Sequence, residues 1–487
     1  MDLKLQFLLL FYFDRALSKN QLYTFEDDFS FGVATSAYQT EGAWNEDGKG
    51  LSFWDYLTHN TDIIVDNSTG DVACNSYRMV ETDIALLKTL GVRHYRFSIA
   101  WTRIFPDGFP NRINWDGVRF YDDLITKLVE NHIEPWVTIS HFDHPYSLEL
   151  LGGWYQETMA DYLADYADFL FKTYGNRVKT WITVNEPYSI CVNGLPLKGN
   201  SIPSGVAEYI CGYNVIKAHA AVWKRYQKYR PQQNGKLSMA FSLQAYLPAS
   251  DSVEDREAAE RANQFSFGWF VHPLVYGNYP EVMIDIIQRY SLAQGFTTSR
   301  LPRFDIEDLI SITGTYDYIG LNNYDTYLVS ANNDTIDAQP SYFNDMGVKI
   351  LNNSDWNTTY SIQMRAKGLG IILKWIKENY NSPEIKITEQ GTPDTTGTVL
   401  DYDRHNYLVE NLQQLWKSIT EDGVNVTGYT VWSFLDNFEW NKGYTVKYGL
   451  NAVNFDDPLR IRVPKLSSVT YRNVLKRKNL QGVHKIY

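Results

Sequence analysis

Short runs of β-forming residues alternate along this chain with longer stretches that carry apolar residues at helical spacing. Two of the short runs, 135–139 and 384–388, are too apolar to keep one face in water, which is typical of strands buried in a parallel sheet. The predicted strands are Phe29–Ser36, His94–Ile99, Glu134–Ser140, Thr180–Asn185, Lys236–Ser242, Tyr316–Asn322, Glu384–Thr388 and Gly428–Phe434. The predicted helices include Tyr77–Leu90, Gly117–Asn131, Met159–Tyr174, Tyr209–Tyr229, Ser361–Tyr380 and Arg404–Glu421.

Eight strand–helix units in one chain predict an α/β fold, a closed (β/α)8 barrel of the TIM type. No linker or low-complexity tract divides the sequence, so we expect a single barrel domain over residues 19–487. The alternative is an open doubly wound sheet. The Gly-rich dinucleotide fingerprint of that fold is missing after the first predicted strand, which favours the barrel.

The first eighteen residues have the pattern of a secretory signal peptide. Lys4 precedes a short apolar stretch, Leu5–Phe13, and Ala16-Leu17-Ser18 offers a small-x-small cleavage site. The alternative is an ordinary helix or strand of the fold. The sequence also contains five glycosylation sequons, which favour secretion: Asn67, Asn333, Asn352, Asn357 and Asn425.

Composition narrows the possible partners. The formal net charge of -12 argues against nucleic acid, and no run of eighteen apolar residues is present to span a membrane. Three cysteines are too few for a disulfide framework. Cys191 and Cys211 are candidates to pair in an oxidising compartment, or alternatively to lie buried as small hydrophobes. No sequence feature indicates an oligomeric state.

Polar and aromatic residues recur where the predicted strands end. Because polar side chains at the mouth of an apolar barrel are costly to bury unless paired, their recurrence implies a site there. Only the fifth strand offers no candidate. The residues at or near the other seven strand ends are Gln39, Glu41, Arg96, His141, Asn185, Glu186, Asn322, Tyr324, Glu389, Trp432, Glu439 and Trp440.

Two of these residues, Glu186 and Glu389, follow the fourth and seventh strands and are expected to converge across the barrel mouth. Paired carboxylates without metal ligands nearby indicate acid/base and nucleophilic chemistry at an acetal. His141, Asp143 and His144 are the candidates for a metal cluster. Adjacent side chains at a strand end point to opposite sides and no third ligand group is evident, so we expect no metal.

Four motifs in order resemble those of glycoside hydrolase family one, the β-glucosidase family, within a resemblance that runs from Phe29 to Arg472. They are the N-terminal signature 31–42 (FGVATSAYQTEG), the acid/base motif 183–187 (TVNEP), the nucleophile motif 387–391 (ITEQG) and the glycone motif 432–440 (WSFLDNFEW). The resemblance implies a retaining enzyme that hydrolyses terminal β-D-glucosides through a covalent glycosyl-enzyme, without a cofactor.

The resemblance also implies roles for individual residues. Glu186 would be the general acid/base and Glu389 the nucleophile, with Arg96 and Tyr324 contacting Glu389 to keep it ionised and oriented. Sugars present apolar ring faces and polar edges, which aromatic walls with amide and carboxylate partners suit. The residues expected to bind the substrate are Gln39, His141, Asn185, Asn322, Trp432, Glu439 and Trp440.

The sequence departs from the family pattern near this site. Gln390 replaces the Asn that normally follows the nucleophile, Phe142 and His144 stand where Trp and Leu are common, and Tyr448 replaces a Phe. Two alternatives therefore stay open beside the β-glucosidase. One is a thioglucosidase resembling myrosinase, which a basic aglycone pocket would favour. The other is an inactive sugar-binding protein, which would be expected to lack one of the two carboxylates.

Overall fold

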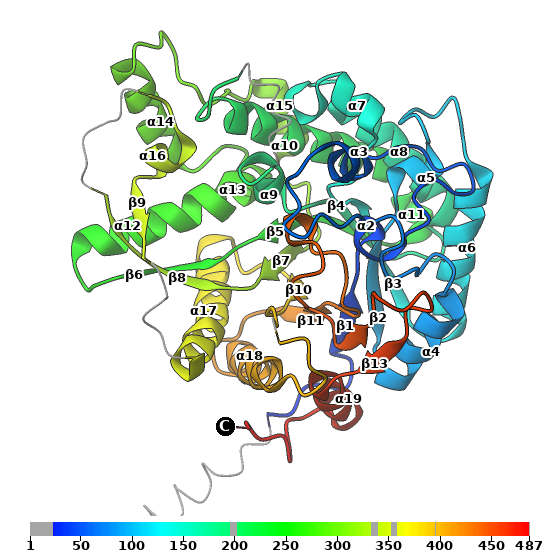
Figure 1. Cartoon of the computed structure of the whole chain (residues 1–487). Coiled ribbons are helices and arrows are strands. Elements are labelled where there is room, and N and C mark those ends of the chain that lie inside the picture. The colour runs from blue at the N-terminus through cyan, green and yellow to red at the C-terminus, as the bar shows by residue number, and fades with distance from the viewer. Residues whose placement is uncertain (1–22, 195–201, 333–338, 352–357, 395, 487) are drawn as a thin grey trace, which may run out of the picture.

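The computed structural model describes residues 23–194, 202–332, 339–351, 358–394 and 396–486. Eight parallel strands close into a barrel in the order β1-β11-β10-β7-β5-β4-β3-β2, which confirms the predicted fold. Figure 1 shows these strands at the centre of the molecule with helices around them. The barrel strands are β1 (Ser30–Ala34), β2 (His94–Ser98), β3 (Glu134–Ser140), β4 (Thr180–Asn185), β5 (Lys236–Ser242), β7 (Ile319–Asn323), β10 (Ile385–Gln390) and β11 (Val426–Trp432).

Strand boundaries differ from the predicted ones by up to three residues, and pairing explains the two differences nearest the site. β11 begins at Val426 because this residue pairs with Ile385 of β10. β10 continues past the predicted end at Thr388 because Glu389 and Gln390 pair with β7. A neighbouring strand thus extends each element beyond what its own sequence indicates.

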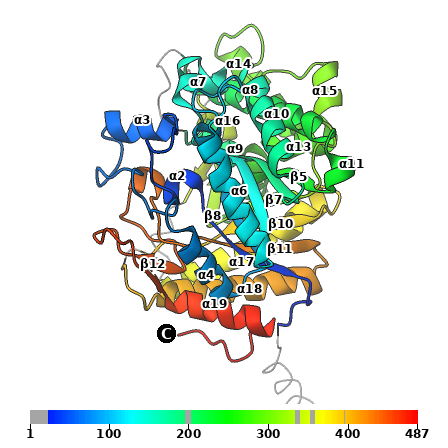
Figure 2. The ribbon, with the colours of Figure 1, turned by 90° about the vertical axis from the view of Figure 1, so that its right-hand side faces the viewer.

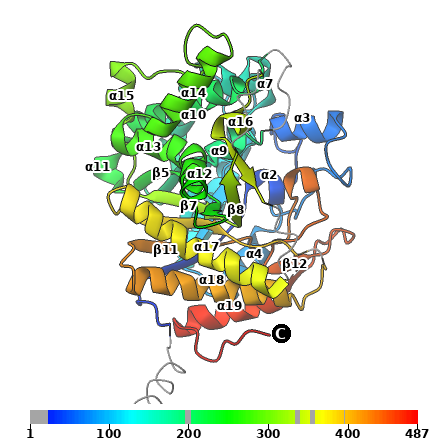
Figure 3. The ribbon, with the colours of Figure 1, turned by 90° about the vertical axis from the view of Figure 1, so that its left-hand side faces the viewer.

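Helices cover the outside of the barrel. Figure 2 shows α4 and α6 outside the strands, and Figure 3 shows α17, α18 and α19 side by side. The helices of eight or more residues are α3 (Phe53–Asn60), α4 (Val80–Leu90), α6 (Trp115–Glu130), α8 (Met159–Tyr174), α10 (Ala207–Tyr226), α12 (Val253–Asn263), α13 (Trp269–Tyr276), α14 (Glu281–Ala293), α17 (Thr358–Asn379), α18 (Tyr402–Thr420) and α19 (Leu466–Arg477).

Helix α6 illustrates why these segments are helical. Its buried residues include Val118, Tyr121, Ile125 and Leu128, spaced three or four apart, so that one face packs on the barrel. At its N-terminus the Asn114 side chain accepts a hydrogen bond from a backbone amide of the first turn.

Shorter helices and two small sheets lie in the connections between the barrel strands and near the C-terminus, outside the predicted strands and helices. A three-stranded sheet, β6-β8-β9, lies among the insertions after β5 and β7, and β12 pairs with β13 near the C-terminus. The remaining bounds are α2 (Ala37–Thr40), α5 (Trp101–Ile104), α7 (Tyr146–Leu150), α9 (Pro187–Cys191), α11 (Arg230–Gln233), α15 (Ile306–Ile312), α16 (Tyr342–Met346), β6 (Ala245–Pro248), β8 (Thr326–Ala331), β9 (Val348–Ile350), β12 (Asn451–Val453) and β13 (Arg462–Pro464).

Cys191 and Cys211 form a disulfide, which joins α9 to α10. Of the five sequons, Asn67 and Asn425 are exposed, and the other three lie outside the described residues. The predicted signal peptide, residues 1–18, also lies outside them. Among the described residues, no helix has the length and apolar character needed to cross a membrane.

Candidate active site

A cavity of about 600 Å³ opens at the carboxyl ends of the barrel strands. The lining includes eight of the residues predicted for the site: His141, Asn185, Glu186, Tyr324, Glu389, Trp432, Glu439 and Trp440. The other three, Gln39, Arg96 and Asn322, are fully buried and contact members of this group. The fold therefore brings together all of the residues to which the family resemblance assigns a role.

Glu389, near the end of β10, is held at both carboxylate oxygens. Arg96 Nη1 lies 2.5 Å from Oε1, and the Tyr324 hydroxyl donates to Oε2 at 2.5 Å. Both contacts agree with the roles that the resemblance implies for Arg96 and Tyr324. Even so, the pKa of Glu389 is raised to about 7, because burial and the nearby Glu186 outweigh the cation and the phenol. Arg96 and Tyr324 thus moderate the cost of ionising a buried carboxyl.

Glu186 lies where β4 passes into α9, with a left-handed backbone at φ 46°. The Ser189 hydroxyl donates to Oε2 at 2.6 Å, and Asn322 Nδ2 donates to Oε1 at 2.9 Å. Both partners are neutral, in contrast to the cation at Glu389. The sequence reading missed Ser189, although a hydroxyl three residues after Glu186, at the start of a helix, was a signal available for it.

Asn185 connects the surroundings of the two glutamates. Its Oδ1 accepts from Arg96 Nη2 at 2.7 Å and from Asn322 Nδ2 at 3.0 Å, while Nδ2 lies 3.2 Å from His141 Nε2. Thr388 completes the arrangement by donating to Asn322 Oδ1 at 2.7 Å. Burial holds the pKa of His141 well below its ordinary value, so this imidazole is neutral and can donate to one partner while it accepts from another.

One wall of the site consists of Gln39, Glu439 and the indoles of Trp432 and Trp440. Gln39 Nε2 donates to Glu439 Oε2 at 3.4 Å. The imidazole of His141 lies nearly parallel to the rings of Trp432 and Trp440, with 5.9 Å between the ring centroids in each pair. Burial, assisted by the charges of the two other glutamates, raises the pKa of Glu439 to about 8. At neutral pH Glu439 is therefore mostly protonated and can donate as well as accept hydrogen bonds.

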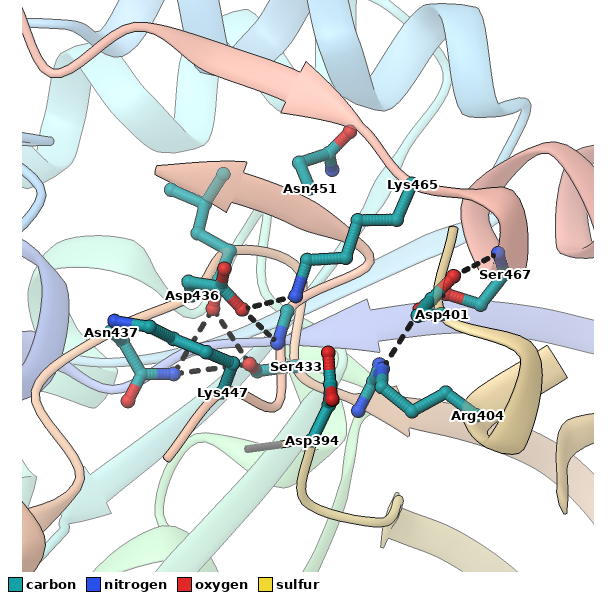
Figure 4. A network of polar contacts seen from close by, with 12 residues as sticks. Asp394, Asp401, Arg404, Ser433, Asp436, Asn437, Lys447, Asn451, Lys465 and Ser467 are labelled. Atoms are coloured by element: carbon teal, nitrogen blue, oxygen red, sulfur yellow. Dashed lines mark hydrogen bonds and ion pairs between the residues drawn. The ribbon is translucent and has the colours of Figure 1, made fainter. Parts of the chain in front are cut away.

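A buried polar network, drawn in Figure 4, fixes the loop that follows β11. Lys465 Nζ lies 2.7 Å from Asp436 Oδ1, and both side chains are almost completely buried. Asn437 donates to the Ser433 hydroxyl at 3.0 Å and accepts from Gln39 at 3.0 Å. Because this loop leads directly to Glu439, the network fixes the position of the wall to which Glu439 belongs.

The departures from the family pattern occupy different places. Gln390 points away from the cavity, toward Tyr407 and Tyr429. Phe142 and Tyr448 line the cavity. His144 lines it too, and its Nε2 lies 2.9 Å from a carboxylate oxygen of Glu149. Among the described residues no group of three His, Cys, Asp or Glu side chains is arranged to hold a metal.

Two other strand-end results differ from the sequence reading. Glu41 lies outside the cavity, where it pairs with Arg103 at 3.0 Å and accepts from the Tyr121 hydroxyl at 2.6 Å. The fifth strand, which offered no candidate, contributes Ser242 and the nearby Gln244 to the lining. Neither residue belongs to a catalytic motif in the sequence, so only their position in the structure shows that they line the cavity.

The sequence profile described as glycosyl hydrolase family 1 matches residues 21–480. Among curated proteins, Myrosinase 1 of Brevicoryne brassicae is 39% identical over 462 residues, covering 93% of this chain and 98% of that protein. The human cytosolic beta-glucosidase is 39% identical over 466 residues, covering 94% and 99%. Among solved structures, a mutant rice beta-glucosidase in a covalent complex with Glc has a TM-score of 0.85 and 36% identity, covering 92% of this chain and 98% of that one.

Proposed function

Because the chain belongs to glycosyl hydrolase family 1 and is a retaining β-glycosidase, we propose that it hydrolyses terminal β-D-glucosides, with Glu389 as nucleophile and Glu186 as general acid/base. One observation carries the division of roles. The cation of the site, Arg96, contacts Glu389, whereas Glu186 has a hydroxyl and an amide as partners. A neighbouring cation favours the ionised form that a nucleophile needs.

In the first step, ionised Glu389 attacks the anomeric carbon while protonated Glu186 gives its proton to the leaving oxygen. A glycosyl ester forms on Glu389 and the aglycone departs as an alcohol. The negative charge of Glu389 disappears in the ester. Glu186 is then left as the ionised member of the pair.

In the second step, Glu186 takes a proton from a water molecule as that water attacks the anomeric carbon. The bond to Glu389 breaks, the carboxylate is regenerated and Glu186 is protonated again. Two successive inversions give net retention. The related rice enzyme has been solved, as a mutant, in a covalent complex with Glc, which supports a covalent intermediate in the proposed reaction.

For the glycone, we propose binding by the wall described above. Gln39, Glu439 and His141 offer donors and acceptors for hydroxyl groups at the sugar edge, and the indoles offer an apolar face. Asn185 is proposed to contact the 2-hydroxyl, an interaction that strengthens in the transition state.

The cavity lining favours an O-linked substrate with an uncharged aglycone. Among the described lining residues there is no Lys or Arg, while five carboxyl side chains are present: Glu149, Glu186, Asp325, Glu389 and Glu439. A sulfated thioglucoside would therefore find no cationic partner among the lining residues that the structure describes. The similarity to Myrosinase 1 keeps thioglucosidase as the second candidate.

A substrate panel tests these proposals. We expect turnover of p-nitrophenyl β-D-glucoside and of neutral alkyl or aryl β-D-glucosides, and at least tenfold lower kcat/KM for a sulfated thioglucoside, on the order of 1.4 kcal/mol. Faster cleavage of the sulfated thioglucoside would reverse the order of the two candidates. Binding of the whole panel without turnover would instead favour the inactive sugar-binding protein.

We also propose that the protein is secreted and glycosylated. The Cys191–Cys211 disulfide and the exposed sequons at Asn67 and Asn425 support this proposal, because disulfides persist in oxidising compartments. Expression in a eukaryotic cell line tests it. We expect protein in the medium, an N-terminus near residue 19 and a smaller apparent mass after enzymatic deglycosylation. Retention of the full-length chain in the cytosol would contradict it.

A further inference from the structure

Gln390 follows Glu389 directly, but it points to the other side of β10. Side chains alternate along a strand, so Glu389 faces the cavity while Gln390 faces the outer layer. Gln390 is 1% exposed and both ends of its amide are used. Its Oε1 accepts from the Tyr429 hydroxyl at 2.6 Å, and its Nε2 donates to the Tyr407 hydroxyl at 2.7 Å.

These contacts continue back to the nucleophile. Tyr407, on α18, accepts from Gln390 and donates its own proton to the backbone carbonyl of Tyr324 at 2.7 Å. The Tyr324 side chain then donates to Glu389. A path of hydrogen bonds thus starts at Gln390 on the outer face of β10 and returns to the same strand at Glu389 on its inner face. The path passes through Tyr324, the residue that follows β7.

Arg365 of α17 provides a second anchor for the same segment. Its Nη2 donates to the Tyr324 carbonyl at 3.4 Å and its Nε lies 2.5 Å from Asp325 Oδ1. The guanidinium also lies over the Tyr407 ring, 4.9 Å from its centroid. Of the two donors to the Tyr324 carbonyl, Tyr407 makes the shorter and hence the stronger contact.

We propose that Gln390 and Tyr407 are positioning residues for the nucleophile, which hold the backbone at Tyr324 so that its phenol meets Glu389. The inference rests on the proposed role of Glu389. It also assigns a purpose to the Gln390 departure: an Asn here is shorter by one C–C bond, about 1.5 Å, and does not reach both tyrosine hydroxyls from the same backbone. Loss of either positioning residue loosens Tyr324 without touching the substrate.

The consequence is a change in how pH controls the reaction. Four groups bear on the ionisation of Glu389: Arg96 from β2, Glu186 at the end of β4, Tyr324 after β7 and Glu439 after β11. Arg96 and the Tyr324 hydrogen bond lower the pKa of Glu389, while burial and the charge of Glu186 raise it. If Tyr324 is held loosely, its lowering effect weakens. The acid limb of the kcat/KM profile then moves to higher pH.

The test compares Tyr407→Phe and Gln390→Asn with Tyr174→Phe as the matched control. Tyr174 is also a fully buried tyrosine that donates to a backbone carbonyl, that of Val118 at 2.9 Å, and both residues lie on outer helices, α8 and α6, instead of on the path from Gln390 to Tyr324. We expect kcat/KM to fall about tenfold for Tyr407→Phe, with its acid limb shifted upward. Tyr174→Phe is expected to lose a similar amount of thermal stability and to keep the wild-type profile.

A double-mutant cycle shows whether Tyr407 acts through Tyr324. In a Tyr324→Phe background, Tyr407→Phe is expected to cost less than twofold, because the hydroxyl it would position is gone. An equal loss in both backgrounds, or an unshifted acid limb in Tyr407→Phe and Gln390→Asn, overturns the proposal. Failure of the proposed function is distinguishable, because it appears as absence of β-glucoside hydrolysis by the wild-type protein.

Discussion

Burial of Glu439 gives a residue-scale trade-off between stability and binding. Its folded-state pKa, about 8, lies above the ordinary value of 4.5, so the folded state prefers the protonated form. The stability contributed by that preference is present below about pH 4.5 and is lost as the pH rises through about 8. Glu439→Gln removes the titration but keeps the shape. Between pH 5 and pH 9, we expect the free energy of unfolding of the variant to rise by a few kcal/mol relative to that of the wild type. Urea denaturation measures this difference.

The same substitution should weaken substrate binding, since the amide replaces a carboxyl at the glycone wall. An increase in KM at all pH values is expected. A stability difference between variant and wild type that stays constant from pH 5 to pH 9 would contradict the raised pKa of Glu439.

Ser189 is a second residue whose effect the geometry defines. Its hydroxyl donates to Glu186 at 2.6 Å, so Ser189→Ala frees the proposed acid from one of its supports. We expect kcat/KM for an alkyl β-glucoside to fall about fivefold and that for p-nitrophenyl β-glucoside to change little, because a poor leaving group needs the proton more. Equal losses on both substrates would show that Ser189 does not act through Glu186.

At the scale of elements, the loop after β11 depends on the buried Asp436–Lys465 pair. Lys465→Met leaves Asp436 charged and buried, which costs about 3–5 kcal/mol. Asp436→Asn combined with Lys465→Met removes both charges and should recover part of that loss. Urea denaturation measures the stability, and KM reports whether the loop still places Glu439. A single variant as stable as wild type would show that the pair is unimportant.

The barrel strands and their order were predictable because apolar runs, and the alternation of strands with helical stretches, are visible locally in the sequence. The structure of the insertions between them was not predictable. The segment from β6 to α14 contains helix α12, which is mostly polar and has only Ala258, Ala259, Ala262 and Asn263 buried. Such a helix gives a weak apolar pattern, and its position depends on packing against β6 and β8.

Site residues show the same division. Glu186 and Glu389 were predictable because the carboxyl ends of parallel strands meet at one face of a barrel. The Gln390–Tyr407–Tyr324 path was not, because it depends on side-chain directions and on contacts between elements distant in sequence. For Ser189 the sequence offered only a local signal, its place three residues after Glu186. The raised pKa of Glu389 was missed for a related reason: the net effect requires the extent of burial, which motifs do not contain.

At the scale of the whole molecule, the disulfide closes the segment between α9 and α10. For Cys191 and Cys211, which are 20 residues apart, breaking the bond should lower the free energy of unfolding by about 3 kcal/mol. We expect the Cys191→Ala, Cys211→Ala double variant to melt at lower temperature than the oxidised wild type and to be insensitive to reductant. If reductant lowers the melting temperature of both proteins equally, the disulfide is not the cause.

The two glutamates act in different roles in the proposed reaction, and azide distinguishes these roles. In Glu389→Ala, azide can enter the space of the nucleophile and react with a β-glucoside that has a good leaving group. A single inversion then gives the α-glucosyl azide. In Glu186→Ala the ester on Glu389 still forms, and azide in place of water gives the β-glucosyl azide.

The decisive measurement is therefore the anomeric configuration of the azide product, determined by proton NMR for each variant. We predict that Glu389→Ala has negligible hydrolysis without azide and yields the α-azide with it, while Glu186→Ala yields the β-azide. Near-normal hydrolysis by Glu389→Ala, or the opposite assignment of the two products, would contradict the central claim.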